Sequence, residues 1–423
     1  MIDFKNYATN FVDDIEKNLY LSINEKTKSV TYKLEKVLNA FSNSHLNVQD
    51  FASLTGYGHG DLGREKIDKI FADVLEAEKA VVRAQLVSGT HAIASSLFGV
   101  LRPGDNLLSI TGRPYESLEE VIGLRGSGQG SLLDFGISYE EISLKSDGCI
   151  DLLALEKALN IPRKIIFIQR SCGYTWRPSL SIKVIKDICD LCHKIQPNSI
   201  CFVDNCYGEF VENKEPTAVG ADLIAGSLIK NLGGTLVPTG GYIAGKADLV
   251  DKACCRLTAP GIGSEGGITF NLNRIILQGL FLAPQMVSEA LIGAEIIAAA
   301  FSHLGFQVLP ASGSMRSDLI QVIRIGDPQI LQMICRSFQE KSPIGSFLDP
   351  VPSSMPGYEN NLVMAGGTFV DGSTSEFSAD APMKPPFDLF IQGGSHRSHV
   401  KIALIHALSN LFQAGLIKLP QNG

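Results

Sequence analysis

The stretch Ala-Gly-Ser-Leu-Ile-Lys-Asn-Leu-Gly-Gly-Thr, residues 225–235, places Lys230 between an apolar segment typical of a buried strand and a run of glycines. Upstream, the apolar run Ile-Cys-Phe-Val at 200–203 ends at Asp204. Ligands of α/β proteins collect where the carboxyl ends of parallel strands meet. We therefore expect the amine of Lys230 and the carboxylate of Asp204 to face one site.

An amine and an acid in this arrangement suit pyridoxal phosphate. The lysine can bind the cofactor aldehyde covalently, and the acid can keep the pyridine nitrogen protonated, so that the ring withdraws electrons from the substrate. A lysine that follows a strand is, by itself, most often a solvated surface amine. The interpretation therefore depends on further features of the chain.

Three such features occur in the expected order. Ser88, Gly89 and Thr90 open a helix-like run, and the free backbone N–H groups of a helix start attract a phosphate. Tyr115 follows the next strand-like segment and could stack on the pyridine, and Ser227 could reach the phosphate. Taken singly, the helix start is better explained as an ordinary N-cap and Tyr115 as a ring that covers loop backbone, and Ser227 could simply cap a turn. Their order along the chain is the one that a single βα layer would deliver.

A family resemblance is carried by residues 55–64, 88–92, 114–120, 169–171, 173–174, 176–179, 203–210, 226–241, 256–261, 355–358 and 392–394. On these stretches the chain resembles the fold-type I pyridoxal phosphate enzymes. More narrowly, it is similar to the methionine gamma-lyase and cystathionine lyase relatives that are named aluminium-resistance proteins. Nothing in these residues explains a tolerance to aluminium.

The resemblance implies the α/β fold of the aspartate aminotransferase-like, PLP-dependent transferases, with a mainly parallel seven-stranded sheet and a smaller α+β C-terminal domain. The alternation of strand-like and helix-like segments from about residue 51 independently favours a mainly parallel sheet. We expect a helical arm at 1–50, a cofactor-binding domain at 51–283 and a C-terminal domain at 284–423. A long helix is expected to begin at Pro284, and the loop 342–358 to cover the site.

The resemblance also implies the roles of individual residues. Lys230 would anchor the cofactor and, once freed, take the Cα proton, which we expect to require a pKa below its ordinary value. Asp204 would pair with the pyridine nitrogen, and Tyr115 would stack on the ring. The remaining cofactor contacts would come from Ser88, Gly89, Thr90, Arg177 and Ser227, with Arg177 near the ring hydroxyl.

The resemblance further implies a homodimer or homotetramer whose sites lie at subunit interfaces. Tyr57 would reach the phosphate held by the neighbouring subunit. The relatives carry an arginine two positions after this tyrosine, where this chain has His59, and the nearest arginine is Arg64. A substrate carboxylate prefers a bidentate arginine. Arg316 and Arg397 of the second domain are the main candidates.

The expected reaction is elimination from a small sulfur-bearing amino acid of the cystathionine, methionine or cysteine type. A carbon–sulfur lyase of this kind releases a thiol, ammonia and a 2-oxo acid, and the sequence does not separate β from γ elimination. The alternatives are an aminotransferase, an aldolase, a desulfurase that would use Cys172, or a non-catalytic protein that retains the scaffold.

Composition limits the partners and the compartment. A net charge of −7 without a basic stripe argues against nucleic acid and anionic membranes. Nine cysteines indicate free thiols in a reducing cytosol, and residues 1–6 lack a secretory signal. The segment Cys-Asp-Leu-Cys-His at 189–193 spells a haem attachment motif, but its apolar spacing predicts a buried helix stripe instead. We expect no metal site from these cysteines or from Cys201 and Cys206.

Overall fold

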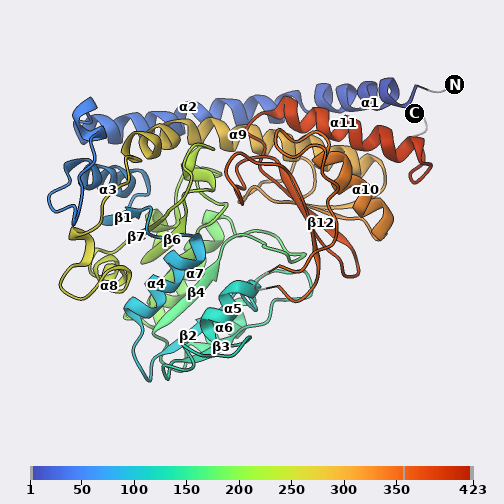
Figure 1. Ribbon diagram of the computed structural model, residues 1–423. Coiled ribbons are helices and arrows are strands. Elements are labelled where there is room, and N and C mark those ends of the chain that lie inside the picture. Colours follow the sequence, from blue (N-terminus) through green and yellow to red (C-terminus); the bar gives the residue numbers. More distant parts are fainter. Residues whose placement is uncertain (1–2, 356–357, 420–423) are drawn as a thin grey trace.

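The computed structural model describes residues 3–355 and 358–419. Its large lobe is built on a seven-stranded sheet with the strand order β1-β7-β6-β5-β4-β2-β3 (Figure 1). In that order the strands are Lys79–Arg83, Gly241–Gly245, Leu223–Ser227, Ile200–Asp204, Ile165–Gln169, Asn106–Ser109 and Ser138–Glu141. Strands β6, β5, β4, β2 and β3 are parallel, whereas β7 pairs antiparallel with both β1 and β6. This sheet confirms the predicted mainly parallel architecture.

Helices cover both faces of this sheet because its central strands are buried on both sides. All five residues of β4, β5, β6 and β7 are buried. One apolar core joins the sheet to α4 (Gly89–Val100), α5 (Glu116–Ile122) and α8 (Ala247–Leu257). The core of the other face contains α3 (Leu62–Val74), α6 (Leu152–Ala158) and α7 (Ile182–Ile195). Parallel sheets require this double cover.

The small lobe contains an antiparallel sheet with the order β10-β11-β12-β9-β8. In that order its strands are Leu362–Ala365, Ser378–Pro382, Asp388–Gln392, Gln321–Arg324 and Gln307–Leu309. Helices α10 (Pro328–Gln339) and α11 (Arg397–Gln413) share one apolar core with this sheet.

Two helices form the expected N-terminal arm, α1 (Phe4–Asn18) and α2 (Tyr20–Asn43), and both run along the top of the molecule in Figure 1. The buried residues of α1 belong to the core of the small lobe, and α2 runs alongside α9 (Asn273–His303). The short helix Val48–Phe51 then leads into the large lobe.

Helix α9 links the two lobes and differs from the prediction at its start. It begins at Asn273, so Pro284 and the expected boundary at 283/284 lie inside the helix. Proline removes one backbone N–H, but burial of Ala283, Pro284 and Val287 against the large lobe holds the helix together. The helix is long and apolar enough to cross a membrane, yet 67% of its most apolar window is buried inside the protein. It is a core helix, as expected for the apolar segment 290–301.

Candidate active site

The carboxyl ends of β4, β5 and β6 bring the predicted residues together. Asp204 ends β5 and pairs in register with Gln169 of β4 and Ala225 of β6. Ser227 ends β6, and Lys230 follows after one turn. The site is a cavity of about 210 Å³ lined by Ser88, Gly89, Thr90, Tyr115, Ser117, Gln169, Ser171, Gly173, Tyr174, Asp204, Cys206, Tyr207, Ser227, Ile229, Lys230 and Tyr358. A larger cavity of about 610 Å³ lies at the amino ends of β2, β4 and β5, and none of the predicted site residues line it.

The start of α4 forms one wall of the cavity. Ser88 caps this helix by accepting a hydrogen bond from the backbone N–H of His91 at 3.0 Å. A Cβ atom on Gly89 would lie 3.0 Å from Sγ of Cys206 and 3.3 Å from Cβ of Ser227, so the backbone approaches these residues as only glycine allows. The helix start therefore presents N–H groups and a positive dipole end to the cavity, which fits a phosphate.

Tyr115 and Asp204 complete the surface that a pyridine ring would need. The Tyr115 hydroxyl lies 3.2 Å from Oγ1 of Thr90, which fixes the ring beside the helix start. Asp204 is buried and accepts a hydrogen bond from the backbone N–H of Cys206 at 3.1 Å. Burial raises the pKa of Asp204 above its ordinary value, against the opposing effects of Cys206 and Lys230. The positive charge of a protonated pyridine nitrogen would stabilise the ionised form of Asp204 in this buried position.

Lys230 is partly buried, and its Nζ atom lies 3.5 Å from the centroid of the Tyr207 ring. Burial acts to lower the pKa of Lys230, but Tyr207, Cys206 and Asp204 outweigh it and raise the pKa above its ordinary value. The structure therefore corrects the expected direction. The reason is the character of its neighbours, because Tyr207, Cys206 and Asp204 stabilise the protonated amine.

Tyr57 lies outside the cavity of its own chain. Its side chain is 83% exposed, and its ring stacks on His59 with the centroids 5.6 Å apart. Arg64 holds this loop, because its Nη1 atom donates to the backbone oxygens of Gly58 at 2.7 Å and Gly267 at 2.8 Å. Arg64 thus shapes the segment that presents Tyr57 to solvent.

The three remaining arginine predictions fall away from the cavity wall. Arg177 is buried and donates to the backbone oxygens of Gln169 at 2.9 Å and Pro178 at 3.0 Å, and also to Ser171. Arg316 is buried against Glu295, and Arg397 forms an ion pair with Glu289. Among the described residues that line the cavity, Lys230 is the only basic side chain.

Three tyrosines in the cavity wall had no predicted role. Tyr174 donates its hydroxyl proton to buried Asp380 at 2.7 Å, and its ring lies 5.7 Å from that of Tyr358. Tyr358 belongs to the loop that was expected to cover the site, although neighbouring Pro356 and Gly357 lie outside the described residues. Tyr207 could have been noticed, because it follows the strand that ends at Asp204.

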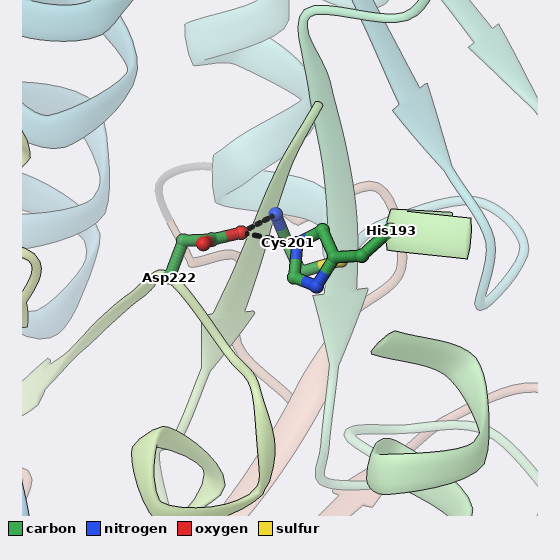
Figure 2. Close-up of side chains that lie close together, drawn as sticks. All are labelled: His193, Cys201 and Asp222. Carbon is green, nitrogen blue, oxygen red and sulfur yellow. Dashed lines mark hydrogen bonds and ion pairs between the residues drawn. The ribbon is translucent and has the colours of Figure 1, made fainter. Parts of the chain in front are cut away.

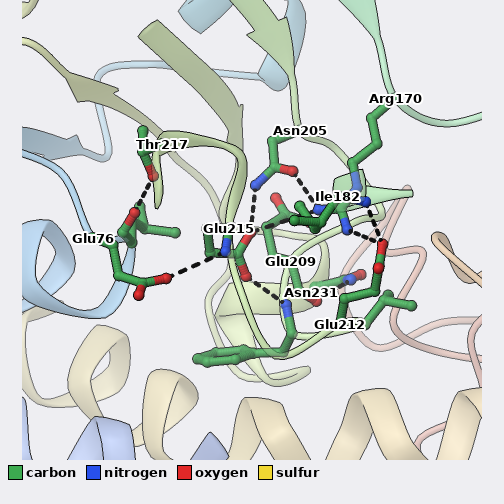
Figure 3. Close-up of polar contacts among 12 residues, drawn as sticks. Glu76, Arg170, Ile182, Asn205, Glu209, Glu212, Glu215, Thr217 and Asn231 are labelled. Atoms are coloured by element: carbon green, nitrogen blue, oxygen red, sulfur yellow. Dashed lines mark hydrogen bonds and ion pairs between the residues drawn. The ribbon is translucent and has the colours of Figure 1, made fainter. Parts of the chain in front are cut away.

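Behind the cavity, a buried network holds the residue next to Asp204 (Figure 3). Asn205 accepts a hydrogen bond from Nη1 of Arg170 at 2.8 Å and donates one to Oε2 of Glu215 at 3.0 Å. Arg170 also pairs with Glu212 at 3.2 Å. These contacts fix Asn205 between Arg170 and Glu215 at the end of β5, while Nε of Arg170 is buried without a hydrogen-bond partner among the described residues.

The same network reaches the residue next to Lys230. Asn231 donates to the backbone oxygen of Glu209 at 2.8 Å, and the Tyr242 hydroxyl donates to Oε1 of Glu209 at 2.7 Å. Burial raises the pKa of Glu209 to about 8. Within the described part of the chain, Oε2 of Glu209 and Oδ1 of Asn231 are buried without a hydrogen-bond partner. A proton on Glu209 would provide a donor at this point.

Comparison with known proteins agrees with this geometry. The sequence profile of the methionine gamma-lyase family matches residues 8–412. The Bacillus subtilis protein YnbB, which is uncharacterised, is 47% identical over 383 residues, spanning 90% of this chain and 91% of YnbB. A carbon–sulfur lyase from Clostridium novyi NT, described as involved in aluminium resistance, has a structure with a TM-score of 0.92 and 42% identity, covering 97% of this chain and 100% of that one.

A more distant structure defines the fold alone. The pyridoxal-5'-phosphate-dependent protein YhfS of Escherichia coli matches with a TM-score of 0.61 and 17% identity, over 92% of this chain and 97% of that one. Because the family profile covers nearly the whole sequence, the chain belongs to the methionine gamma-lyase family.

Proposed function

We propose that this protein is a pyridoxal phosphate-dependent carbon–sulfur lyase, which cleaves a small sulfur-bearing amino acid by β or γ elimination. The observation that carries the proposal is the meeting of Lys230, Asp204 and the start of α4 in one cavity. Methionine gamma-lyase membership and the carbon–sulfur lyase name of the C. novyi protein support the reaction class. The products would be a thiol, ammonia and a 2-oxo acid.

Different residues would bind different parts of the cofactor. Ser88, Gly89, Thr90 and Ser227 would bind the phosphate, and Tyr115 would stack on the ring. Asp204 would hold the proton of the ring nitrogen. When bound, pyridoxal phosphate supplies an electron sink for the bond electrons at the substrate Cα.

Lys230 would perform the proton transfers. The free amine of Lys230 would lie beside Tyr207, Cys206 and Asp204, which favour its protonated form. A high proton affinity suits a base that takes the Cα proton. For γ elimination, the same amine would deliver and remove protons at Cβ as well, within one cavity.

The cysteine that a desulfurase would require is badly placed for that role. Cys172 is buried, its backbone N–H donates to Asp318 at 3.2 Å, and it packs against Ile320, Val322 and Phe390. A nucleophile that must travel to the substrate would need a mobile loop. The contacts of Cys172 therefore favour elimination over desulfuration.

An absorption spectrum tests the proposal. The purified wild type should show a Schiff-base band and release thiol and 2-oxo acid from L-cystathionine, L-methionine or L-cysteine. Lys230→Ala should lose the normal band and the turnover, whereas Lys252→Ala, on an exposed face of α8, should keep both. A wild type that shows no band after incubation with pyridoxal phosphate would refute the cofactor. A normal band without products would refute the lyase activity.

We also propose a homodimer or homotetramer with shared sites, in which Tyr57 contacts the phosphate bound by the neighbouring chain. The exposed apolar side chains Leu54, Tyr57, Leu62, Val87 and Phe270 support an interface around this loop. Hybrids of Lys230→Ala and Tyr57→Phe chains should regain activity, because one of the two sites would contain both native residues. Hybrids that form but stay inactive would contradict the shared site.

A further inference from the structure

A cluster of three side chains, His193, Cys201 and Asp222, lies near the amino ends of β5 and β6, whereas the cavity lies at their carboxyl ends (Figure 2). His193 is in the last turn of α7, Cys201 is the second residue of β5, and Asp222 directly precedes β6. Asp204 ends the same strand, so roughly 10 Å of strand separates the two sites at about 3.3 Å per residue. The cluster includes part of the cysteine and histidine motif at 189–193, which the proposed lyase chemistry does not use.

The three side chains converge on one point. A ring nitrogen of His193, Sγ of Cys201 and a carboxylate oxygen of Asp222 all lie within 4.8 Å of one another. Nε2 of His193 is 2.8 Å from Oδ2 of Asp222, which also accepts the backbone N–H of Cys201 at 2.7 Å. Tetrahedral zinc sites with bond lengths of about 2.0–2.3 Å separate their ligand atoms by roughly 3.3–3.8 Å. Small side-chain adjustments would therefore seat a metal ion.

Contrary to the expectation from the sequence that Cys201 binds no metal, we propose that His193, Cys201 and Asp222 bind a zinc-type divalent cation, with water as the fourth ligand. Imidazole nitrogen, thiolate sulfur and carboxylate oxygen are the ligands that zinc takes in proteins. The ion replaces the thiol proton of Cys201, which leaves to solvent, while the ring proton of His193 moves to Nδ1. One thiolate and one carboxylate then balance the two positive charges.

The surroundings provide both an entry path and supporting contacts. A cavity of about 280 Å³ reaches His193 and Asp222 from the surface, whereas Cys201 is fully buried. The neighbouring thiols of Cys189 and Cys192, together with burial, raise the pKa of Cys201, so an ion must displace a firmly held proton from this thiol. Once the metal binds, the same two thiols can donate to the bound sulfur, as outer contacts of metal ligands commonly do.

One neighbour competes with the metal. Nζ of Lys246 is 2.7 Å from Oδ1 of Asp222, but its side chain is 55% exposed and free to turn into solvent. Oδ2 faces His193 and remains available. An ion at this position would join the end of α7 to the starts of β5 and β6, so it would stabilise the lobe without entering the lyase reaction.

Cobalt(II) provides a spectroscopic probe of the full-length protein with its cofactor bound. We expect one cobalt ion per chain, with tetrahedral ligand-field bands and a thiolate charge-transfer band, and we expect zinc to displace it. Both His193→Ala and Cys201→Ala should abolish these bands. Because Cys201 is in the core, the half-buried His193 provides the variant least prone to misfolding.

Two cysteines outside the cluster serve as controls. Cys149 is exposed and Cys255 is partly exposed, so Cys149→Ser and Cys255→Ser should keep the cobalt spectrum. Loss of the spectrum in either control would assign the metal to a surface thiol and overturn the proposal. No tetrahedral spectrum in the wild type, or an unchanged one in His193→Ala, would also overturn it.

A gain of affinity provides a further test. Lys246→Ala removes the cation that competes for Asp222, and exposed ion pairs of this kind correspond to roughly 1.5- to 5-fold in an equilibrium constant. Zinc affinity, measured by competition with a chromophoric chelator, should rise by about that factor. An unchanged or lower affinity would contradict the role of Asp222 as a ligand.

Discussion

Replacement of Glu209 by glutamine should remove one pH-dependent component of the stability of the protein. Glu209 is fully buried behind the cavity, and burial raises its pKa to about 8 from an ordinary value of 4.5. Its Oε1 atom already accepts the Tyr242 hydroxyl, whereas Oε2 has no partner within the described chain. The side-chain amide of glutamine resembles the protonated acid in shape and can donate where Oε2 stands.

The direction of the pH dependence follows from the number of protons bound by the folded and the unfolded protein. Below pH 4.5 the carboxyl group is protonated in both the folded and the unfolded protein, and above about pH 8 it is ionised in both. Between these values the unfolded chain loses the proton while the folded protein retains it, so stability falls as the pH rises. A pKa difference of about 3.5 corresponds to roughly 5 kcal/mol, and relaxation around the charge reduces the expected loss to about 2–5 kcal/mol.

Urea unfolding at pH 5, 6, 7 and 8, at one protein concentration, measures this effect. The free energy of unfolding of Glu209→Gln relative to wild type should rise steadily with pH and level off above about pH 8. Glu120→Gln, on the exposed side of α5, serves as the control and should track the wild type at every pH. A constant difference between Glu209→Gln and wild type across this range would refute a protonated, buried Glu209.

Three further predictions concern the cavity. Gly89→Ala places a Cβ atom 3.0 Å from Sγ of Cys206 and 3.3 Å from Cβ of Ser227. Overpacking of this kind costs about 1–3 kcal/mol and should weaken pyridoxal phosphate binding at least fivefold. An unchanged affinity in an absorbance titration would contradict the close approach. Tyr207→Leu removes the ring over Nζ of Lys230 and should lower the pKa of Lys230 by about one, given roughly 0.5–2 kcal/mol for a cation–π contact. The pH profile of cofactor capture by the cofactor-free protein should then shift to lower pH, and an unshifted profile would count against the contact. Arg316 and Arg397 pair with Glu295 and Glu289 away from the cavity wall, so alanine at either position should leave KM unchanged in protein with a normal cofactor band; a tenfold rise in KM would instead assign that arginine to the substrate carboxylate.

Most elements of the fold could be predicted because the buried strands carry their own apolar signal. Strands β4 and β5 are apolar except at their last residues, and the structure places β5 on the apolar run from Ile200 to Asp204 that the sequence indicated. The sequence did not predict elements whose pattern of apolar residues is weak or misleading. Strand β3 reads Ser-Tyr-Glu-Glu and is largely exposed, so it has no apolar pattern, and Pro284 suggested a helix start where packing preserves a helix interior.

The structure brings together the predicted site residues that the backbone fixes, whereas the predicted arginines lie away from the cavity wall. Asp204, Ser227 and Gly89 occupy set positions at strand ends or a helix start, so the order of the chain was enough to bring them together. The direction in which an arginine side chain points depends on partners that lie far away in the sequence. Arg397, for example, pairs with Glu289, 108 residues earlier, a contact that no local pattern reveals.

The position of α1 has a consequence for synthesis of the chain on the ribosome. Ala8, Val12 and Ile15 share an apolar core with Leu404 and Leu408 of α11, which is the last helix to be made. Helix α1 therefore emerges from the ribosome with its apolar face uncovered, and this face stays uncovered until α11 has been translated. During this interval its apolar face is open to chaperones, and folding of the small lobe can finish only after translation of the C-terminal residues.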